Sequence, residues 1–168
     1  MPKTIESAVE PRAQIAALCW RAGKSGAEVL LISSRETGRW VIPKGWPMDG
    51  RSAPEAAAIE AWEEAGVKGQ IATAKLGHFT YDKTLKRDTK NESSLPCIVE
   101  VFPLQVEKLA TDFPEQRQRR RKWFAPDKAA RRVAEAELKA LLAGFNPALA
   151  EGAQPAEIRL RKRHKGKS

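Results

Sequence analysis

The spacing of apolar residues along the chain predicts a series of short strands. Apolar side chains fill Ile15 to Trp20 and return in Glu28 to Ser33, and a Gly-containing turn at 23–26 separates the two segments. Two short apolar segments joined by such a turn are typical of a strand pair. Further strands are expected at Trp40–Ile42, Gly77–Tyr81 and Leu95–Leu104. The basic cluster at 117–122 leads into Trp123 and Phe124, where another packed strand is expected.

Helical patterns occupy two other stretches. Residues 52–66 begin with the capping-box pattern of Ser52 and Glu55 and end at Gly66, which suits a left-handed helix cap. Residues 127–143 are rich in Ala, Leu, Glu and Arg and predict one or two helices. A loop is expected at 43–50 and an exposed polar connection at 83–94. The order of elements indicates one α/β domain over 1–145, without internal repeats, followed by a flexible basic tail, 146–168.

The helix predicted at 52–66 carries three glutamates on one edge. At about 100° of rotation per residue, Glu60, Glu63 and Glu64 fall within an arc of roughly 100°. The opposite side is apolar, with Ala58, Ala61, Trp62 and Ala65. No Lys or Arg at i,i+4 relieves the repulsion between the carboxylates. The pattern fits either a solvated face or a site for a hard divalent cation such as Mg²⁺, which prefers carboxylate oxygens.

Residues 45–67 resemble the box of the Nudix hydrolase family, G-x5-E-x7-R-E-U-x-E-E-x-G-U, where U is aliphatic. Gly45, the three glutamates, Gly66 and Val67 match in spacing. The chain departs from the box at two main positions: Arg51 replaces a Glu and Ile59 replaces an Arg. Ala61 at the aliphatic position is a smaller departure. The resemblance implies an α/β/α sandwich with a mixed sheet.

The segments around the box are similar to the diphosphoinositol polyphosphate phosphohydrolase branch, whose members also act on diadenosine polyphosphates. The similarity covers roughly residues 14–143 and is carried by Ala17–Arg21, Glu28–Gly45 and Arg119–Phe124. It departs at Lys122, where that branch tends to have Glu, and in the loop 83–94. The basic tail lies outside it.

The resemblance implies hydrolysis of a phosphoanhydride bond by water that attacks phosphorus, with bound Mg²⁺ or Mn²⁺. Glu60 and Glu64 would hold the metal with the Gly45 carbonyl, and Glu63 would orient or deprotonate the water. A polyphosphorylated small-molecule substrate needs cations around its non-reacting groups. The candidate substrate-binding residues are Arg21, Ser33, Ser34, Arg35, Arg39, Lys44, Arg119, Arg120 and Arg121. Trp46 is open to stacking on an adenine, whereas Trp40 is expected in the core.

Charge and composition narrow the possible partners. The chain has 168 residues, 42% of them apolar, and a formal charge of +9 that favours anionic partners. Six Lys and Arg residues and no acid follow Glu157, so most of the excess lies in the tail. No apolar run approaches the roughly 20 residues of a membrane span, and the start lacks a secretory signal, so a cytoplasmic location is expected. Cys19 and Cys97 are predicted to be buried thiols.

Two other functions fit the same residues. Within the same fold, the chain could remove pyrophosphate from RNA 5′ ends or hydrolyse damaged nucleotides. From another class, it could be a catalytically weak protein that binds nucleic acid through the basic tail, or another anionic ligand, as Arg51 and Ile59 suggest. The three retained glutamates favour the enzyme. The sequence leaves the oligomeric state open.

Overall fold

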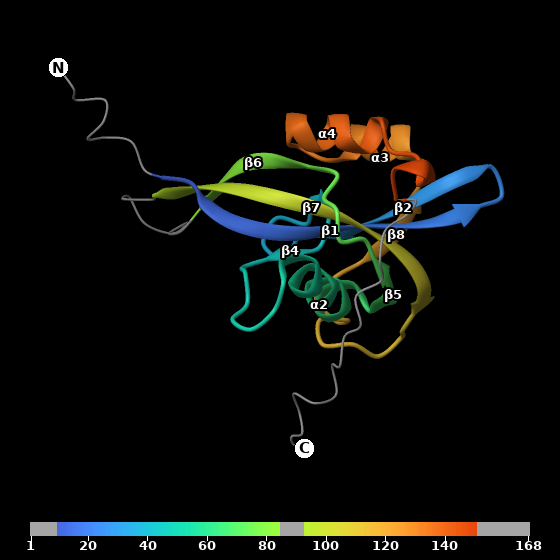
Figure 1. The fold of residues 1–168 in the computed structure, drawn as a ribbon, viewed down its shortest axis with the longest axis horizontal. Coiled ribbons are helices and arrows are strands. Elements are labelled where there is room, and N and C mark those ends of the chain that lie inside the picture. Colours follow the sequence, from blue (N-terminus) through green and yellow to red (C-terminus); the bar gives the residue numbers. More distant parts are fainter. Residues whose placement is uncertain (1–9, 85–92, 151–168) are drawn as a thin grey trace.

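The fold has three layers, with a mixed sheet between helices on both of its faces. It is described by a computed structural model over residues 10–84 and 93–150. Helix α2 (Ala53–Ala65) covers one face, and α3 (Pro126–Arg132) with α4 (Ala136–Ala143) covers the other (Figure 1). This arrangement confirms the α/β/α sandwich. Of the predicted tail, the short 3-10 helix η1 (Pro147–Ala150) is described, and 151–168 lie outside the described residues.

The described part of the chain forms a sheet of eight strands. Their bounds are β1 (Arg12–Gly23), β2 (Gly26–Ser33), β3 (Trp40–Val41), β4 (Lys44–Gly45), β5 (Val67–Ile71), β6 (Gly77–Thr84), β7 (Ser94–Leu109) and β8 (Arg121–Phe124). The main path is β3-β2-β1-β7-β5, with β4 beside β1, β6 beside β7 and β8 beside β2. β1 and β7 pair in parallel, and the other pairs are antiparallel, so the sheet is mixed.

Strand β1 is apolar at successive positions because both of its faces are covered. Leu18 and Trp20 belong to the core under α3 and α4, whereas Ala17 and Cys19 belong to the core under α2. A strand with two covered faces shows a continuous apolar run rather than alternation. The predicted burial of the cysteines is confirmed, since Cys19 and Cys97 are both buried and free.

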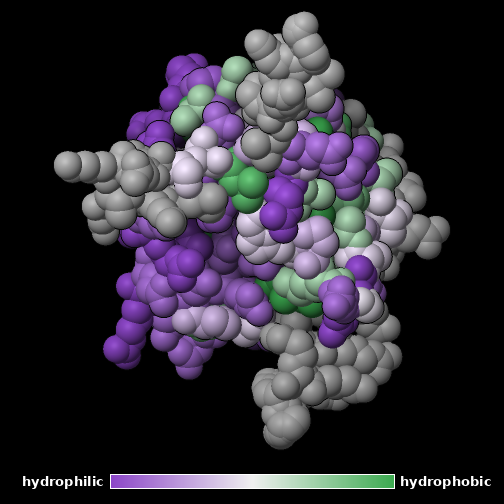
Figure 2. Space-filling view, turned by 90° about the vertical axis from the view of Figure 1, so that its left-hand side faces the viewer, coloured by the Kyte–Doolittle hydropathy of each residue, from purple (hydrophilic) through white to green (hydrophobic). Residues whose placement is uncertain are grey.

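The outer surface and the helices add two observations. On the face that Figure 2 shows, hydrophilic residues gather on the left and hydrophobic ones form small separate patches. Within the ranges 10–84 and 93–150, no helix has the length and apolar character needed to cross a membrane.

The predicted elements exist, and two strands were not predicted. β4 lies inside the segment predicted as a loop, and it is held to β1 by the pair Ile15↔Gly45 and by a 3.0 Å bond from Ala17 N to Pro43 O. Two paired residues are too short for a periodic signal. β5 was also missed, because its central residues are polar. β6 and β7 extend beyond the predicted ranges, and 127–143 divides into two helices.

Helix α2 begins and ends at the residues that the sequence indicated. Ser52 Oγ accepts from Glu55 N at 3.3 Å, and Glu55 Oε1 accepts from Ser52 N at 3.0 Å, which forms the capping box. Gly66 is left-handed with φ of 69°, and a side chain there would overlap Phe113. Both ends of the helix are therefore held, which fixes the position of its glutamates.

Replacement of the cap tests this anchoring. Ser52→Ala removes the acceptor for Glu55 N and is expected to lower the free energy of unfolding by about 1 kcal/mol. Urea denaturation followed by circular dichroism measures the change. Ser52→Thr keeps the hydroxyl and should stay close to the original stability; equal midpoints for the Ala variant and the unaltered chain would contradict the cap.

Candidate active site

The contact between α2 and β4 brings two carboxylates to one place. A side chain added at Gly45 would overlap the carboxylate of Glu60, so the backbone of β4 lies directly against this glutamate. One turn further along α2, Glu64 Oε1 accepts a 3.3 Å hydrogen bond from Lys44 N. The predicted pair, Glu60 and Glu64, therefore meets β4 at Lys44 and Gly45.

Burial and mutual repulsion disfavour two negative charges in this position. Burial, together with the charge of Glu64, raises the pKa of Glu60 to about 8. The pKa of Glu64 is also raised by burial, although the charge of Arg119 opposes the shift. Two neighbouring carboxylates that resist full ionisation form a site where a bound cation relieves their mutual repulsion.

A third carboxylate and an arginine complete this cluster. Arg119, whose side chain is 8% exposed, lies 2.9 Å from Glu115 and 3.6 Å from Glu64. Its Nη1 also donates to the backbone oxygen of Ser33 at 3.1 Å. Glu115 N in turn donates to the backbone oxygen of Glu63 at 3.0 Å. The segment before β8 is thereby fixed to both β2 and α2.

These residues surround a cavity of about 290 Å³, which we call the glutamate cavity. Its lining consists of Gln14, Arg35, Glu36, Lys44, Gly45, Trp46, Glu60, Glu64, Tyr81, Lys83, Glu115 and Arg119. Tyr81 Oη donates to Gln14 at 2.7 Å, and Lys44 Nζ lies 4.8 Å from the centre of the Tyr81 ring. Burial lowers the pKa of Lys44.

The donor set suits a hard divalent cation. Carboxylate oxygens are the ligands that Mg²⁺ and Mn²⁺ prefer, and Mg²⁺ commonly uses one or two of them with waters and substrate phosphates. In the described ranges, no three His, Cys, Asp or Glu side chains converge as a metal-binding group. Glu60 and Glu64 therefore fit a cation whose coordination shell is completed by water and substrate.

A second cavity, the arginine cavity, adjoins the first through Arg35 and Arg119 and also has a volume of about 290 Å³. It is lined by Ser33, Ser34, Arg35, Gly38, Arg117, Gln118, Arg119 and Arg120. Four of these residues are arginines and none is acidic. This cavity has the charge expected for a phosphate chain.

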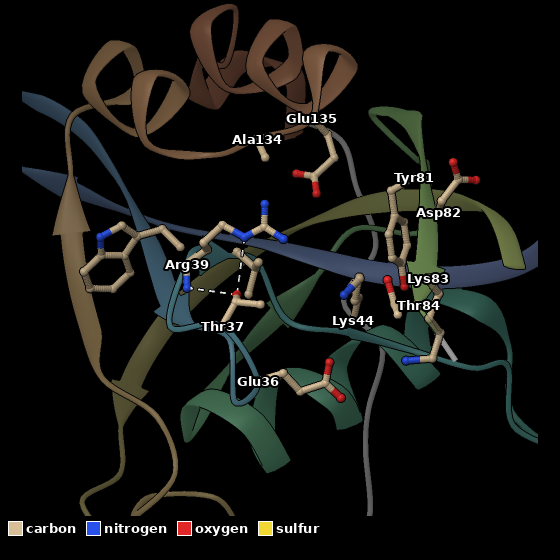
Figure 3. Close-up of a pocket in the computed structure, with 12 residues that line it drawn as sticks. Glu36, Thr37, Arg39, Lys44, Tyr81, Asp82, Lys83, Thr84, Ala134 and Glu135 are labelled. Carbon is tan, nitrogen blue, oxygen red and sulfur yellow. Dashed lines mark hydrogen bonds between the residues drawn. The ribbon is translucent and has the colours of Figure 1, made fainter. Parts of the chain in front are cut away.

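A third cavity, the distal cavity, adjoins the glutamate cavity on another side and has a volume of about 130 Å³ (Figure 3). It is lined by Glu36, Thr37, Arg39, Trp40, Val41, Lys44, Tyr81, Asp82, Lys83, Thr84, Ala134 and Glu135. Glu36, Lys44, Tyr81 and Lys83 line both cavities. Trp40 packs edge-on against Phe124, consistent with the expected core position.

The structure brings together most of the predicted substrate-binding residues. Ser33, Ser34, Arg35, Arg119 and Arg120 line the arginine cavity. Lys44 lines the other two cavities, and Arg39 lines the distal cavity. Ser33 is buried, and its Oγ accepts from Arg120 N at 2.8 Å, so it shapes the cavity.

Three predicted residues lie outside these cavity linings. Arg21 pairs with Glu28 at 2.8 Å and stacks on Trp123, roughly 20 Å along β1 from Ile15. Arg121 donates at 2.9 Å to the backbone oxygens of Ala65 and Ala110, and so closes the end of α2. Glu63 is half-buried on α2, and its charge helps to raise the pKa of Glu60.

Sequence reasoning did not single out Glu115, Gln14 or Tyr81. Glu115 follows β7 in a segment with no regular pattern, and only its contact with Arg119 links it to the helix glutamates. The apolar side of α2 was also placed inaccurately. Trp62 is half-buried, and Glu64 is among the buried residues, because the Glu64 edge of the helix faces β4.

Comparison with known families identifies the fold. The model of the NUDIX domain matches residues 12–145. The chain belongs to the Nudix family. Among curated Nudix relatives, diphosphoinositol polyphosphate phosphohydrolase 3-alpha of Mus musculus is 35% identical over 112 residues, or 65% of this chain and 61% of that protein. Mitochondrial Nudix hydrolase 12 of Arabidopsis thaliana is 35% identical over 102 residues, or 61% of this chain and 50% of that protein.

Solved structures agree on the Nudix fold. An Ap4A hydrolase of C. elegans superposes with a TM-score of 0.56 and 21% identity, covering 84% of this chain and all of that one. The present chain spans between half and two thirds of the length of the two curated relatives named above.

The two departures from the Nudix box have clear positions in the structure. Ile59 is buried at 2% exposure, whereas the half-buried Arg51 makes no ion pair with any residue of the described ranges. The Glu and Arg that the box has at these two positions are Arg51 and Ile59 here, so no ion pair can join them. Arg119 is the cation that contacts Glu64 here.

The approach of β4 to α2 can be tested at Gly45. Gly45→Ala places a methyl group on the Glu60 carboxylate and is expected to weaken Mn²⁺ binding about tenfold, since metal sites respond on this scale to displaced ligands. Electron paramagnetic resonance titration of Mn²⁺ measures the affinity. Gly144→Ala adds the same methyl where it meets only Ala140 O, at the ordinary contact distance of 3.4 Å, and serves as the control. Equal Mn²⁺ affinity in both variants would contradict the predicted site.

Proposed function

We propose that this chain is a hydrolase that uses Mg²⁺ or Mn²⁺ to cleave phosphoanhydride bonds in polyphosphorylated compounds. The observation that carries the proposal is the junction of two cavities of different charge. One holds the half-buried Glu60 and the buried Glu64, and the other is lined by four arginines. A substrate whose reacting phosphate lies at the pair can extend its remaining phosphates among the arginines.

The roles of the acidic residues follow from their positions. Glu60 and Glu64 would hold the cation, with the Gly45 carbonyl as a further ligand. The cation supplies charge neutralisation on phosphate oxygens and lowers the pKa of a bound water. Glu63 is our proposed residue for orienting or deprotonating the attacking water, because it lies close enough to act on Glu60. Glu115 acts through Arg119 as a positioning residue.

Different arginines are proposed to bind different phosphates of the substrate. Arg35 lies between the two cavities, with its Nε 3.9 Å from Glu115, and is placed to contact a phosphate next to the reacting one. Arg117 and Arg120 line the arginine cavity from the opposite segment. Relatives carry names that refer to diphosphoinositol polyphosphates and to Ap4A, so both substrate classes are candidates. A cytoplasmic location stays a prediction.

The metal and carboxylate requirements form one test. Purified protein with Mg²⁺ or Mn²⁺ is expected to hydrolyse diadenosine polyphosphates, diphosphoinositol phosphates or nucleoside triphosphates, and chelation by EDTA should abolish turnover. Glu60→Gln and Glu64→Gln should each lower kcat/KM by about 100-fold or more, since even outer-shell changes at metal sites cost up to that amount. Phosphate or mononucleotide release measures the rate.

The matched control is Glu107→Gln. Glu107 is an exposed β7 carboxylate that accepts from Gln70, so its replacement should leave the rate unchanged. Full activity in both Glu60→Gln and Glu64→Gln would refute the proposed metal site.

The arginine cavity predicts a different kinetic effect. Arg117→Ala or Arg120→Ala removes a cation that binds the substrate and the transition state equally, so KM should rise about fivefold with little change in kcat. Steady-state kinetics separate the two constants. Arg131→Ala, which removes an exposed arginine paired with Asp127 on α3, is the control. A fall in kcat without a rise in KM would argue against this role.

The same assays decide between this proposal and its alternatives. Preference for triphosphorylated RNA 5′ ends or for damaged nucleotides would assign a different substrate to the same site. Salt-dependent nucleic-acid binding without turnover, weakened by removal of residues 158–168, would instead favour a binding protein.

A further inference from the structure

The distal cavity differs in charge from the arginine cavity, although both adjoin the glutamate cavity. The arginine cavity has no acidic residue in its lining, whereas Glu36, Asp82 and Glu135 line the distal cavity. Arg39, Lys44 and Lys83 line it as well. The two cavities therefore offer different environments to the two ends of one substrate.

The carboxylates of the distal cavity are not neutralised by direct pairing. Among the described residues, none of the three has a Lys or Arg nitrogen within 4.0 Å of its carboxylate. The hydrogen bonds drawn in Figure 3 join Arg39 N and Arg39 Nε to Thr37 Oγ1, at 3.2 and 3.3 Å, and involve none of these acids. The oxygens of these acids are consequently free to accept hydrogen bonds from a ligand.

Two of the acids lie on opposite sides of the cavity. Figure 3 shows Glu135 pointing into it from the turn between α3 and α4, and Glu36 on the opposite side. Tyr81 and Arg39 stand on the other two sides, whereas Asp82 points away. A ligand in this cavity meets two carboxylates, and the flat ring of Tyr81 forms part of the wall.

The turn that carries Glu135 is fixed to the sheet. Glu137, two residues further on, accepts from Thr80 N at 2.7 Å and from Thr80 Oγ1 at 3.0 Å. Leu138 and Leu142 of α4 are buried in the core below. Glu135 is therefore presented by an anchored element.

With both acids and cations in its lining, the distal cavity is less favourable for phosphate than the arginine cavity and can accept neutral hydrogen-bond donors. An ionised carboxylate can accept hydrogen bonds but cannot donate them, so it pairs with a hydroxyl or an amine. A phosphate group beside it is repelled. An inositol polyphosphate carries phosphates around its ring and would place one or more of them against Glu36 and Glu135. The sugar of a nucleoside offers free hydroxyls instead.

We propose that the distal cavity receives the unphosphorylated sugar of a nucleoside polyphosphate, and that Glu36 and Glu135 exclude a densely phosphorylated ring. The inference rests on the proposed hydrolase function and selects one of its two substrate classes. The phosphate chain then runs past Glu60 and Glu64 into the arginine cavity, and the nucleoside end stays on the side of Lys44 and Tyr81. Glu36 and Glu135 are thus specificity residues.

The test compares two substrates in the full chain with Mg²⁺: diadenosine tetraphosphate and a diphosphoinositol pentakisphosphate. The unaltered chain is expected to show at least a tenfold higher kcat/KM for diadenosine tetraphosphate. Glu135→Lys should shift that ratio about tenfold toward the inositol substrate, because it replaces a repelling charge with an attracting one. Glu107→Lys makes the same charge change far from the cavity and should leave the ratio unchanged.

A second comparison examines the hydroxyl contacts directly. Removal of the 2′-hydroxyls from diadenosine tetraphosphate should lower kcat/KM several-fold for the unaltered chain, and the penalty should shrink in Glu135→Ala. Preference for the inositol substrate, or a substrate ratio that Glu135→Lys and Glu107→Lys change equally, would overturn the inference.

The experiment also distinguishes failure of the inference from failure of the proposed hydrolase function. If neither compound is cleaved, the function proposed above is wrong. The inference is then judged by calorimetric binding of the same two compounds to the unaltered chain and to Glu135→Lys. Tighter binding of diadenosine tetraphosphate that Glu135→Lys reverses supports it, and any other order overturns it.

Discussion

The placement of two carboxylates side by side, the half-buried Glu60 and the buried Glu64, is the constraint on which the rest of the site depends. Such a pair is unfavourable alone, because burial and mutual repulsion act in the same direction. It persists because α2 is held at both ends and because β4 carries no side chain at the point of contact. The fold thus creates one site at which a positive charge is favourable.

The chain itself supplies part of this positive charge. Arg119 reaches Glu64 and Glu115 from the segment before β8, and its hydrogen bond to Ser33 O ties the same side chain to the sheet. Positions 51 and 59, where the Nudix box has Glu and Arg, are Arg and Ile here. The cation that reaches a helix glutamate in the described residues comes instead from a distant segment, at Arg119.

The sequence predicted much of the fold and only part of the site. Helix α2, its two caps and the spacing of its glutamates are local features, so their signals lie within a few residues of each other. The β4 pairing and the position of Glu115 depend on contacts between distant segments, and no periodicity reports them. Arg121 shows the opposite error: it lies in a basic run beside Arg119 and Arg120, yet its side chain donates to the backbone oxygens of Ala65 and Ala110 and closes α2. These are contacts between distant segments, which the run of basic residues does not report.

Net charge is a poor guide to the ligand of such a site, because binding depends on where the acids lie. The arginine cavity and the distal cavity are both within reach of the same carboxylate pair, and each contains several cations. What separates them is the presence of Glu36 and Glu135 in one and the absence of acids from the lining of the other. A polyanion that is charged in all directions meets repulsion on one side, whereas a ligand with a charged end and a neutral end meets a complementary group on both. Acidic residues in a basic protein can therefore set specificity by limiting where phosphate is tolerated.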